Sequence, residues 1–412
     1  MANVIVLGAG MAGVSIALQL QKRGWSVALV DRTEPGLETS YGNAGIIQSE
    51  AVEPYAMPRD IATLVSIAIG TSNAVHYRPL TLPQHLNALL RYWWNSAPAR
   101  YSGISAAYAT IIAQATAEHA PLIAAARVEH LVRREGFRVL HRSQSAMDRA
   151  ARNAERVKKE YGVTFKALSP AEFAAAEPSL VNTGAGAIHW LAPWTVSNPG
   201  ALTGAYGQLF QRLGGTFVHG DADTLERTAS GAWRVTTSDG PIEAEHAVVA
   251  LGPWSPLLLA RFGYHFPMVR KRGYHRHYRA QGTLNLPIMD DANSYVIAPM
   301  EKGLRITTGA ELTGNEALPM PVQLRRAEEA AGTILKLGAP VENRPWAGVR
   351  PCMPDMLPVI GAAPKHEGLW LHFGHGHQGF TLGPATARML AELMTGEKPY
   401  VEAAPFRPGR YA

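Results

Sequence analysis

The sequence predicts an α/β protein whose domains are interleaved along the chain. A short apolar run at residues 4–7 precedes a glycine-rich turn, and an amphipathic segment then leads to a second apolar run that ends at Asp31. This order of strand, helix and strand is typical of a parallel sheet. After residue 215 the pattern changes to short strand-like runs, as in a meander. A chain of 412 residues has room for two or three domains, and it has no evident linker.

The composition excludes several classes of protein. Hydrophobic residues make up 47% and charged residues 17%, which is the balance of a folded globular chain. The single cysteine, Cys352, excludes a disulfide framework within the chain and argues against a cysteine-based metal site. The net charge of +6 (39 basic minus 33 acidic residues) is dispersed, so we expect a solvated basic surface and no nucleic-acid partner.

The sequence shows neither a membrane-spanning segment nor a signal peptide, and this sets the expected location in the cell. No apolar stretch reaches the roughly 18 residues that span a bilayer. The first residues enter a strand-like run directly, with no basic region or cleavage site of a signal peptide. We therefore expect a cytoplasmic protein, or one attached peripherally at the inner face of the cytoplasmic membrane.

The N-terminal glycine motif indicates dinucleotide binding. Gly8 permits the tight turn, Gly10 lets a pyrophosphate approach the backbone, and Gly13 lets the helix pack on the strand. The helix N-terminus offers unpaired N–H groups and a partial positive charge to the phosphates. Asp31, 23 residues after Gly8, can accept hydrogen bonds from a ribose and would repel the 2′-phosphate of NADP. The motif does not separate FAD from NAD.

Most other elements can be placed from pattern alone. The segment 58–161 is largely helical, with Pro121 expected to break or kink it. Ser169 begins a capping box, and Asn198 opens a helix that ends near Gly214. The final helix is expected to begin at Pro384. Strands are expected at 216–219, 223–227, 233–237, 242–246, 246–251, 295–298, 304–308 and 368–373.

Several segments, taken together and in order, resemble the FAD-dependent D-amino-acid oxidase superfamily, and within it the bacterial D-amino-acid dehydrogenase group. The resemblance covers nearly the whole chain. The segments that carry it are 8–13 with Asp31, 38–45, 248–255, 346–351, 354–361 and 374–376, with a Trp-rich helix at 83–101.

The resemblance implies two domains. The first is a glutathione-reductase-like Rossmann domain that binds FAD, formed by residues 1–50, 189–262 and 345–412. The second is an α+β substrate-binding domain formed by residues 51–188 and 263–344, whose mixed sheet forms a roof over the flavin ring. We expect non-covalent FAD, because Cys352 does not match the position of the attachment cysteine in the sarcosine-oxidase branch.

The resemblance also implies the residues around FAD. Small and hydroxyl-bearing residues of the loop at 39–45 would run beneath the pyrophosphate and flavin, and the glycine turn at 374–379 would lie near the flavin pyrimidine carbonyls. The expected FAD-binding residues are Gly8, Gly10, Met11, Ala12, Gly13, Asp31, Arg32, Thr39, Ser40, Asn43, Ala44, Gly45, Gly252, Trp254, Gly374, Gly376, His377, Gly379, Phe380 and Thr381.

Four residues are expected to contact the substrate. In the family, the arginine of the motif matched by Arg350 binds the substrate carboxylate through two parallel hydrogen bonds; the alternative is a structural pair with Asp355. Tyr295 matches a tyrosine that donates to the same carboxylate, and otherwise packs on a strand. Tyr274 would line the cavity and His377 would face the substrate. The nearby His375-Gly376-His377 has no further ligands to complete a metal site, so we expect no metal.

The expected activity is oxidation of a D-amino acid by hydride transfer from Cα to flavin N5, giving a 2-oxo acid and ammonia. Electrons would pass to a quinone or another acceptor. Alternatives are a dehydrogenase or oxidase of a secondary-amine acid (D-hydroxyproline, sarcosine, glycine or an opine), in some cases within a hetero-oligomer. An NAD-dependent dehydrogenase and a non-catalytic flavin-binding subunit also remain open. The sequence does not set the substrate, the use of oxygen or the oligomeric state.

Overall fold

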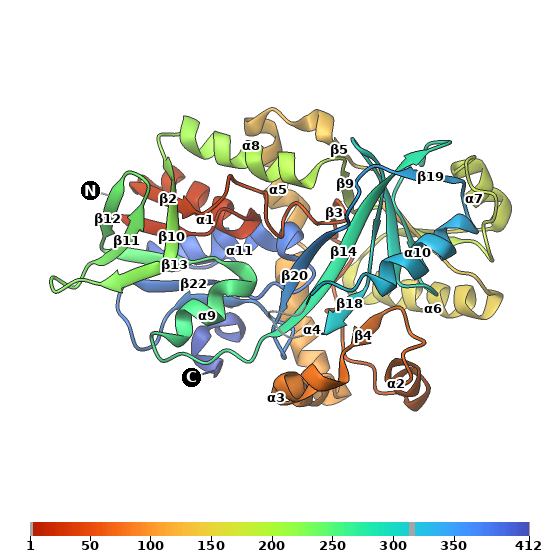
Figure 1. Cartoon of the computed structure of the whole chain (residues 1–412), viewed down its shortest axis with the longest axis horizontal. Helices are drawn as coiled ribbons and strands as arrows, with labels where there is room; N and C mark the ends of the chain where they lie inside the picture. The colour runs from red at the N-terminus through yellow and green to blue at the C-terminus, as the bar shows by residue number, and fades with distance from the viewer. Residues whose placement is uncertain (1–2, 313–317, 412) are drawn as a thin grey trace.

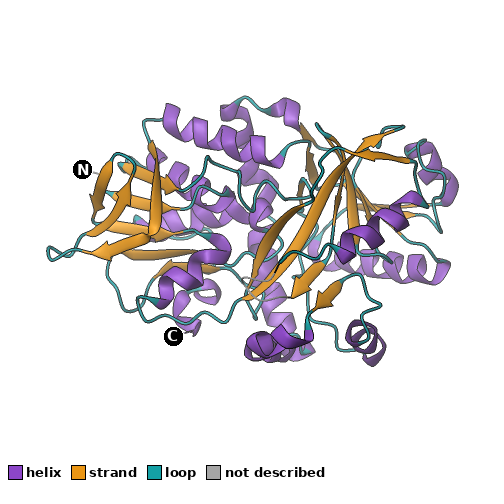
Figure 2. Cartoon of the chain, in the orientation of Figure 1, coloured by secondary structure: helices purple, strands orange, loops and turns teal. Residues whose placement is uncertain are grey.

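Two large β-sheets lie at opposite ends of the molecule, with helices between and around them (Figures 1 and 2). The structure is a computed structural model that describes residues 3–312 and 318–411. It confirms the α/β class and the interleaving, because each sheet takes strands from separate parts of the chain.

The first sheet has parallel strands at its centre, an antiparallel meander at one edge and a single antiparallel strand at the other. Its central strand, β1 (Val4–Leu7), is parallel to its neighbours β2 (Val27–Asp31) and β13 (His246–Val249), and all four β1 residues are buried. Because such strands are buried on both faces, their sequences are continuous runs of apolar residues. The remaining strands are β10 (Thr216–Arg227), β11 (Trp233–Thr237), β12 (Gly240–Ala244), β21 (Val359–Ala362) and β22 (Leu369–Phe373).

The second sheet is mixed and is organised around one long strand, β14 (Val269–Ala280). This strand pairs antiparallel with β17 (Gly303–Thr307), β18 (Ala310–Leu312), β19 (Leu337–Pro340) and β20 (Trp346–Cys352). The other strands are β4 (Val75–Tyr77), β6 (Phe137–Leu140), β7 (Phe165–Leu168), β8 (Ala187–Trp190), β15 (Ile288–Asp290) and β16 (Tyr295–Met300). A small third sheet joins β3 (Ile46–Ile47), β5 (Val132–Arg133) and β9 (Trp194–Val196).

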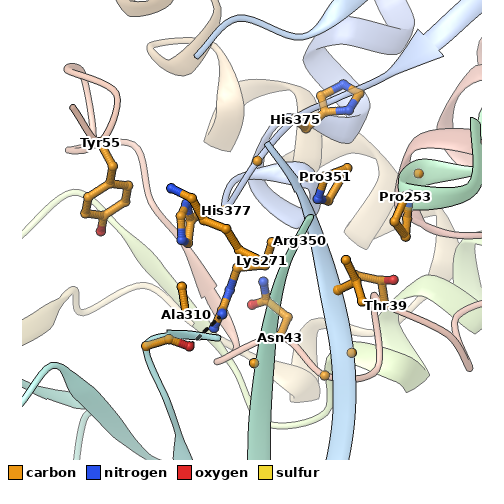
Figure 3. Close-up of a pocket in the computed structure, with 18 of the residues that line it drawn as sticks. Thr39, Asn43, Tyr55, Pro253, Lys271, Ala310, Arg350, Pro351, His375 and His377 are labelled. Atoms are coloured by element: carbon orange, nitrogen blue, oxygen red, sulfur yellow. Dashed lines mark hydrogen bonds between the residues drawn. The ribbon is translucent and has the colours of Figure 1, made fainter. Parts of the chain in front are cut away.

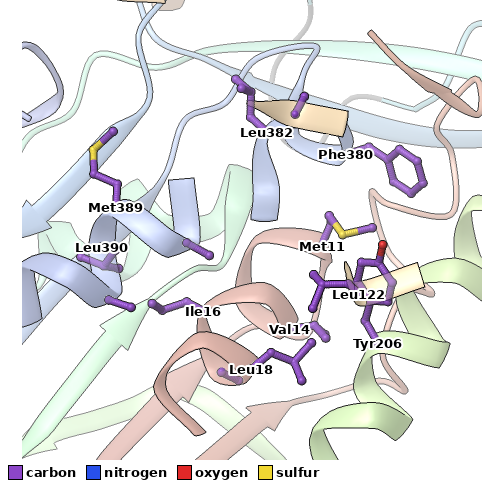
Figure 4. Packing of buried hydrophobic residues seen from close by; sticks show 14 of the residues in the cluster. Met11, Val14, Ile16, Leu18, Leu122, Tyr206, Phe380, Leu382, Met389 and Leu390 are labelled. Atoms are coloured by element: carbon purple, nitrogen blue, oxygen red, sulfur yellow. The ribbon is translucent and has the colours of Figure 1, made fainter. Parts of the chain in front are cut away.

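Four helices contribute most of the helical residues of the apolar core that covers one face of the first sheet (Figure 4). They are α1 (Met11–Lys22), α5 (Ala115–Ala126), α8 (Pro199–Arg212) and α11 (Gly379–Met394). Met11, Val14, Leu122, Tyr206 and Phe380 meet in this core, which fixes the N-terminus of α1. The remaining helices are α2 (Ile61–Ala68), α3 (Leu82–Asn95), α4 (Pro98–Ile112), α6 (Gln144–Tyr161), α7 (Pro170–Ala176), α9 (Ser255–Ala260) and α10 (Val322–Gly332).

The expectations that the helical run breaks at Pro121 and that the last helix begins at Pro384 were wrong. Helix α5 runs through Pro121, and the helical run breaks earlier, between α4 and α5. Helix α11 begins at Gly379 and contains Pro384. The carbonyl that Pro384 leaves without its helical N–H donor is that of Phe380, and His119 Nε2 lies 3.0 Å from it. The pKa of His119 is lowered to about 4 by burial, so the neutral ring donates to this carbonyl, which explains why the helix tolerates the proline.

The predicted helix starts elsewhere are confirmed. Ser169 forms a reciprocal capping box with Glu172, and the Asn198 side chain caps α8. The domain boundaries stay a proposal: β20, inside the expected segment 345–412, pairs with β14 of the second sheet along its whole length.

Candidate active site

A single large cavity of about 1110 Å³ contains most of the predicted site residues. It runs from the glycine turn after β1, past the loop at residues 39–44, to β14 and β20 of the second sheet, and then between α2 and α3. The cavity therefore joins the N-terminal motif to Arg350. Its volume has room for a dinucleotide at one end and a small substrate at the other.

The glycine turn has the close backbone approaches that its sequence predicted. Gly8 has a φ of +104°, and an added Cβ would lie 2.6 Å from the carbonyl oxygen of Ala250. A Cβ on Gly13 would lie 1.7 Å from the carbonyl oxygen of Gly8, so Gly13 serves helix packing and is outside the cavity lining. Gly10 borders the cavity and caps α1 without a side chain. The helix N-terminus thus opens onto the cavity.

Asp31 and Ser40 hold this turn from outside. Asp31 Oδ2 accepts a hydrogen bond of 2.5 Å from the Ala9 backbone N. Ser40 Oγ accepts one of 2.9 Å from the Met11 backbone N, so it satisfies one of the first N–H groups of α1. Asp31 and Ser40 were both expected to lie beside the dinucleotide, and both border the cavity. Each also makes a hydrogen bond to the backbone of the turn that the motif did not predict.

The loop at residues 39–45 is pinned to the second sheet by an arginine that sequence reasoning missed. Arg305 of β17 donates hydrogen bonds to the carbonyl oxygens of Tyr41 (2.8 Å) and Asn43 (2.7 Å). Burial lowers the pKa of Arg305 to about 10. An added Cβ on Gly42 would lie 1.9 Å from the ring of Trp346, so only glycine fits there. Backbone carbonyls as partners leave no pattern in the sequence, which is why Arg305 was not found.

Arg350 lies inside the cavity and has backbone carbonyls as partners. Its Nη2 donates to the Thr308 carbonyl at 2.8 Å, and its Nη1 to the Gly309 carbonyl at 3.0 Å. The alternative pairing with Asp355 is not formed, because Asp355 binds Arg410 at 2.6 Å. No ion pair of Arg350 occurs within residues 3–312 and 318–411. Burial lowers the pKa of Arg350 from its ordinary value.

Lys271 is a second cation beside Arg350, and no motif in the sequence predicted it. It pairs directly with Arg350 across β14 and β20, so both side chains lie on one face of the sheet. Lys271 is buried. Its Nζ lies 3.4 Å from the Tyr92 hydroxyl and 4.5 Å from the centre of the Tyr92 ring. Only the strand register, which links positions 79 residues apart, could have revealed it.

His377 faces these two cations, as Figure 3 shows. Burial, with the charges of Arg350 and Lys271, holds the pKa of His377 well below its ordinary value. Its neutral ring lies 5.0 Å from the ring of Tyr55. His375 instead bonds Thr386 Oγ1 at 2.9 Å. The described chain has no group of three potential metal ligands.

Tyr295 and Tyr274 border the cavity, but their side chains belong to the opposite side of the second sheet. Both lie in the apolar core that includes Leu324 and Ala327 of α10. The Tyr274 hydroxyl bonds Glu311. Burial and the charge of Asp290 raise the pKa of Tyr295, which places its hydroxyl beside Asp290. The structure therefore does not bring either hydroxyl to Arg350.

The remaining predicted cofactor residues divide into two groups. Sixteen of the twenty predicted FAD-binding residues line the cavity: Gly8, Gly10, Met11, Ala12, Asp31, Arg32, Thr39, Ser40, Asn43, Ala44, Gly252, Trp254, Gly376, His377, Gly379 and Phe380. Gly13, Gly45, Gly374 and Thr381 lie behind that lining. A Cβ on Gly45 would meet the Val196 carbonyl at 2.3 Å and one on Gly374 would meet Met353 at 2.7 Å, so these two glycines serve packing.

Comparison with known proteins identifies the family. Residues 3–393 match the model of the FAD dependent oxidoreductase family, DAO. The chain belongs to this DAO family. A D-amino acid dehydrogenase of Chromohalobacter salexigens is 29% identical over 435 residues, covering 100% of both chains. A D-amino-acid oxidase of Bradyrhizobium diazoefficiens is 30% identical, covering 99% of both. The recognised resemblance is thereby confirmed.

Solved structures of the DAO family share the fold. Glycine oxidase from Geobacillus kaustophilus superposes with a TM-score of 0.77 at 20% identity, covering 100% of this chain and 99% of that one. The DAO assignment makes this chain an FAD-dependent oxidoreductase. Within the described residues, no helix is both long and apolar enough to cross a membrane.

Proposed function

We propose that this DAO-family enzyme oxidises D-amino acids to 2-oxo acids and ammonia and passes the electrons to a quinone or another acceptor. The observation that carries the proposal is the pair of cations, Arg350 and Lys271, which share one face of the sheet inside the cavity. Two like charges at directly paired positions disfavour each other. A substrate carboxylate would remove this cost, so the site suits an anionic amino acid.

The residues present fit FAD. The glycine turn leaves open backbone beside the N-terminus of α1, where a pyrophosphate would lie. Arg32 stacks on Trp254, with its guanidinium carbon 4.6 Å from the ring centre, at the same end of the cavity as Asp31. We propose that FAD is held non-covalently; burial raises the pKa of Cys352, which disfavours the thiolate needed for attachment.

The protein would position the substrate by its carboxylate. The guanidinium of Arg350 can offer two parallel N–H groups to that carboxylate, and Lys271 adds a second charge. His377, held neutral, can accept a hydrogen bond from the substrate amine. When bound, FAD supplies the chemistry by accepting the Cα hydride at N5, and the resulting imino acid hydrolyses to the 2-oxo acid and ammonia.

Product analysis tests this proposal. The FAD-loaded enzyme is incubated with single D- or L-amino acids and an artificial electron acceptor, and 2-oxo acid, ammonia and reduced acceptor are measured. We expect equal amounts of the three products from D-amino acids and none from the L-enantiomers. Turnover only of secondary amines such as sarcosine or D-hydroxyproline would replace the proposed substrate class.

A further inference from the structure

The substrate end of the cavity carries two positive charges and, among the residues that the structure describes, no carboxylate. Lys271 and Arg350 line the cavity there, beside His377 (Figure 3). The acids that line the cavity belong to its dinucleotide end, on β2, on the loop after it, or on β10, which pairs with β2; they are Asp31, Glu38, Asp221 and Asp223. The lysine ion pairs of residues 3–312 and 318–411 involve Lys158 and Lys166, so Lys271 has no acidic partner in this part of the chain.

The titratable groups around Lys271 do not supply the missing charge. Burial raises the pKa of the Tyr92 hydroxyl and of the Cys352 thiol, so both keep their protons. Burial also holds the pKa of His377 well below its ordinary value, and its ring is neutral. Glu50 lies outside the cavity lining. The Tyr92 ring, with its centre 4.5 Å from the Lys271 Nζ, stabilises the ammonium but does not cancel its charge.

The two cationic groups lie at separate points along β14. Arg350 reaches across β14 to the carbonyls of Thr308 and Gly309. An added Cβ on Gly273 would overlap the Arg350 guanidinium, so this group lies over Gly273, two positions from Lys271. Two residues of a strand span about 6.6 Å. A carboxylate held by the two parallel N–H groups of Arg350 therefore leaves the Lys271 ammonium without an anion of its own.

We propose that Lys271 is the binding site for a second carboxylate, and that the preferred substrates are D-amino acids with an acidic side chain. Arg350 would hold the α-carboxylate of D-aspartate or D-glutamate, and Lys271 the side-chain carboxylate. With its amine unprotonated, such a substrate carries two negative charges and balances the two cations. A neutral side chain would leave one buried cation uncompensated, which is costly. The inference rests on the proposed function and deepens it by naming the substrate class.

Binding of unreactive acids tests this site without turnover. Glutarate is glutamate without its amine, and glutaramate is the same chain with an amide in place of one carboxylate. Isothermal titration calorimetry measures both acids on the FAD-loaded protein. We expect glutarate to bind at least about tenfold more tightly than glutaramate. In Lys271→Met the ratio of the two dissociation constants should fall to about one, and in Lys271→Arg, which keeps the charge, the preference for glutarate should remain.

Flavin reduction without oxygen extends the test to substrates. The matched pairs are D-glutamate with D-glutamine and D-aspartate with D-asparagine, because each amide has the shape of its acid without the charge. In at least one pair the wild type should have a dissociation constant at least about tenfold lower for the acid than for the amide. Lys271→Met should lose this difference while still being reduced by both members of the pair. Equal affinity for acid and amide in both pairs would overturn the proposal.

A matched variant separates recognition from a structural role. Lys166→Met removes an exposed lysine whose Nζ lies 3.9 Å from Glu172, and it should keep the wild-type preference for glutarate. If Lys271 only supports the packing of Tyr92, Lys271→Met would weaken glutarate and glutaramate alike, and this result would overturn the proposal, as would a wild type that does not bind glutarate. Because calorimetry needs no turnover, a protein that prefers glutarate but oxidises no D-amino acid would retain the second carboxylate site and contradict the proposed function alone.

Discussion

Lys271 and Arg350 occupy directly paired positions on the antiparallel strands β14 and β20, and both side chains enter the same cavity. Adjacent like charges disfavour the folded state unless something compensates them. Their hydrogen-bond partners are neutral: backbone carbonyls for Arg350 and the Tyr92 hydroxyl for Lys271. An anion in the cavity would complete the arrangement, and the predictions below depend on it.

Replacing either cation should weaken substrate binding to different extents. Arg350→Met removes a two-pronged donor, so we expect the dissociation constant for a D-amino acid to rise about 10²- to 10³-fold. Lys271→Met removes a charge that lacks the two-pronged geometry, so we expect the dissociation constant to rise only about tenfold. The constants come from the concentration dependence of anaerobic flavin reduction. Arg156→Lys, at a surface ion pair with Glu53, is the control. Unchanged affinity in Arg350→Met would contradict the assigned role.

Tyr295→Phe should leave substrate affinity unchanged within about twofold. The reason is its place in the core beside α10, on the other side of the sheet from Arg350. The same anaerobic titration measures the effect. A rise in the dissociation constant comparable with that of Arg350→Met would show that the hydroxyl reaches the substrate after all.

Gly10→Ala tests the cofactor site without disturbing the fold. The added methyl would have only Ser40 Oγ near it, at 3.4 Å, but it would enter the space that the pyrophosphate needs. We expect FAD affinity to fall at least about tenfold while circular dichroism of the apoprotein is unchanged. Gly103→Ala in α4, which meets no atom within 4 Å, is the control. Equal FAD affinity in both variants would place the pyrophosphate elsewhere.

Glu50 should make stability depend on pH. Burial raises its pKa from 4.5 to about 7. Between these values the unfolded chain binds fewer protons than the folded one, so the folded state loses stability as pH rises through this window. Glu50→Gln cannot ionise. The free energy of unfolding of this variant should exceed that of the wild type by up to about 3 kcal/mol at pH 8. The difference should be lost near pH 4.

Urea unfolding at both pH values measures the Glu50 effect. Glu155→Gln, at an exposed position whose side chain is 65% accessible, controls for the change from carboxylate to amide. A Glu50→Gln variant that is less stable than the wild type at pH 8 would mean that the charged carboxylate stabilises the fold.

What could be predicted from the sequence was local. The glycine turn and Asp31 lie within one strand–helix–strand unit, where each glycine has a steric reason. Arg350 was found because its motif is contiguous. Lys271 was missed because its role depends on the register between distant strands. Tyr295 was misplaced because successive strand residues face opposite sides, and only the packed sheet shows which side faces the cavity.

Tertiary contacts also decided where helices begin. Pro384 looked like a helix start because proline is favoured in the first turn. In the structure Pro384 leaves the Phe380 carbonyl without its helical donor, and His119 donates to that carbonyl instead. His119 lies 265 residues before Pro384 in the sequence and also bonds the Tyr206 hydroxyl at 2.9 Å. No local pattern encodes that bond.

The most direct test of the central claim is the visible spectrum of the FAD-loaded protein, titrated without oxygen. The panel holds D-amino acids, their L-enantiomers, D-hydroxyproline, sarcosine and an opine. We predict that D-amino acids bleach the flavin band and that L-amino acids do not, with Arg350→Met requiring far higher concentrations. A flavin band that no D-amino acid bleaches would contradict the proposal that this cavity oxidises D-amino acids.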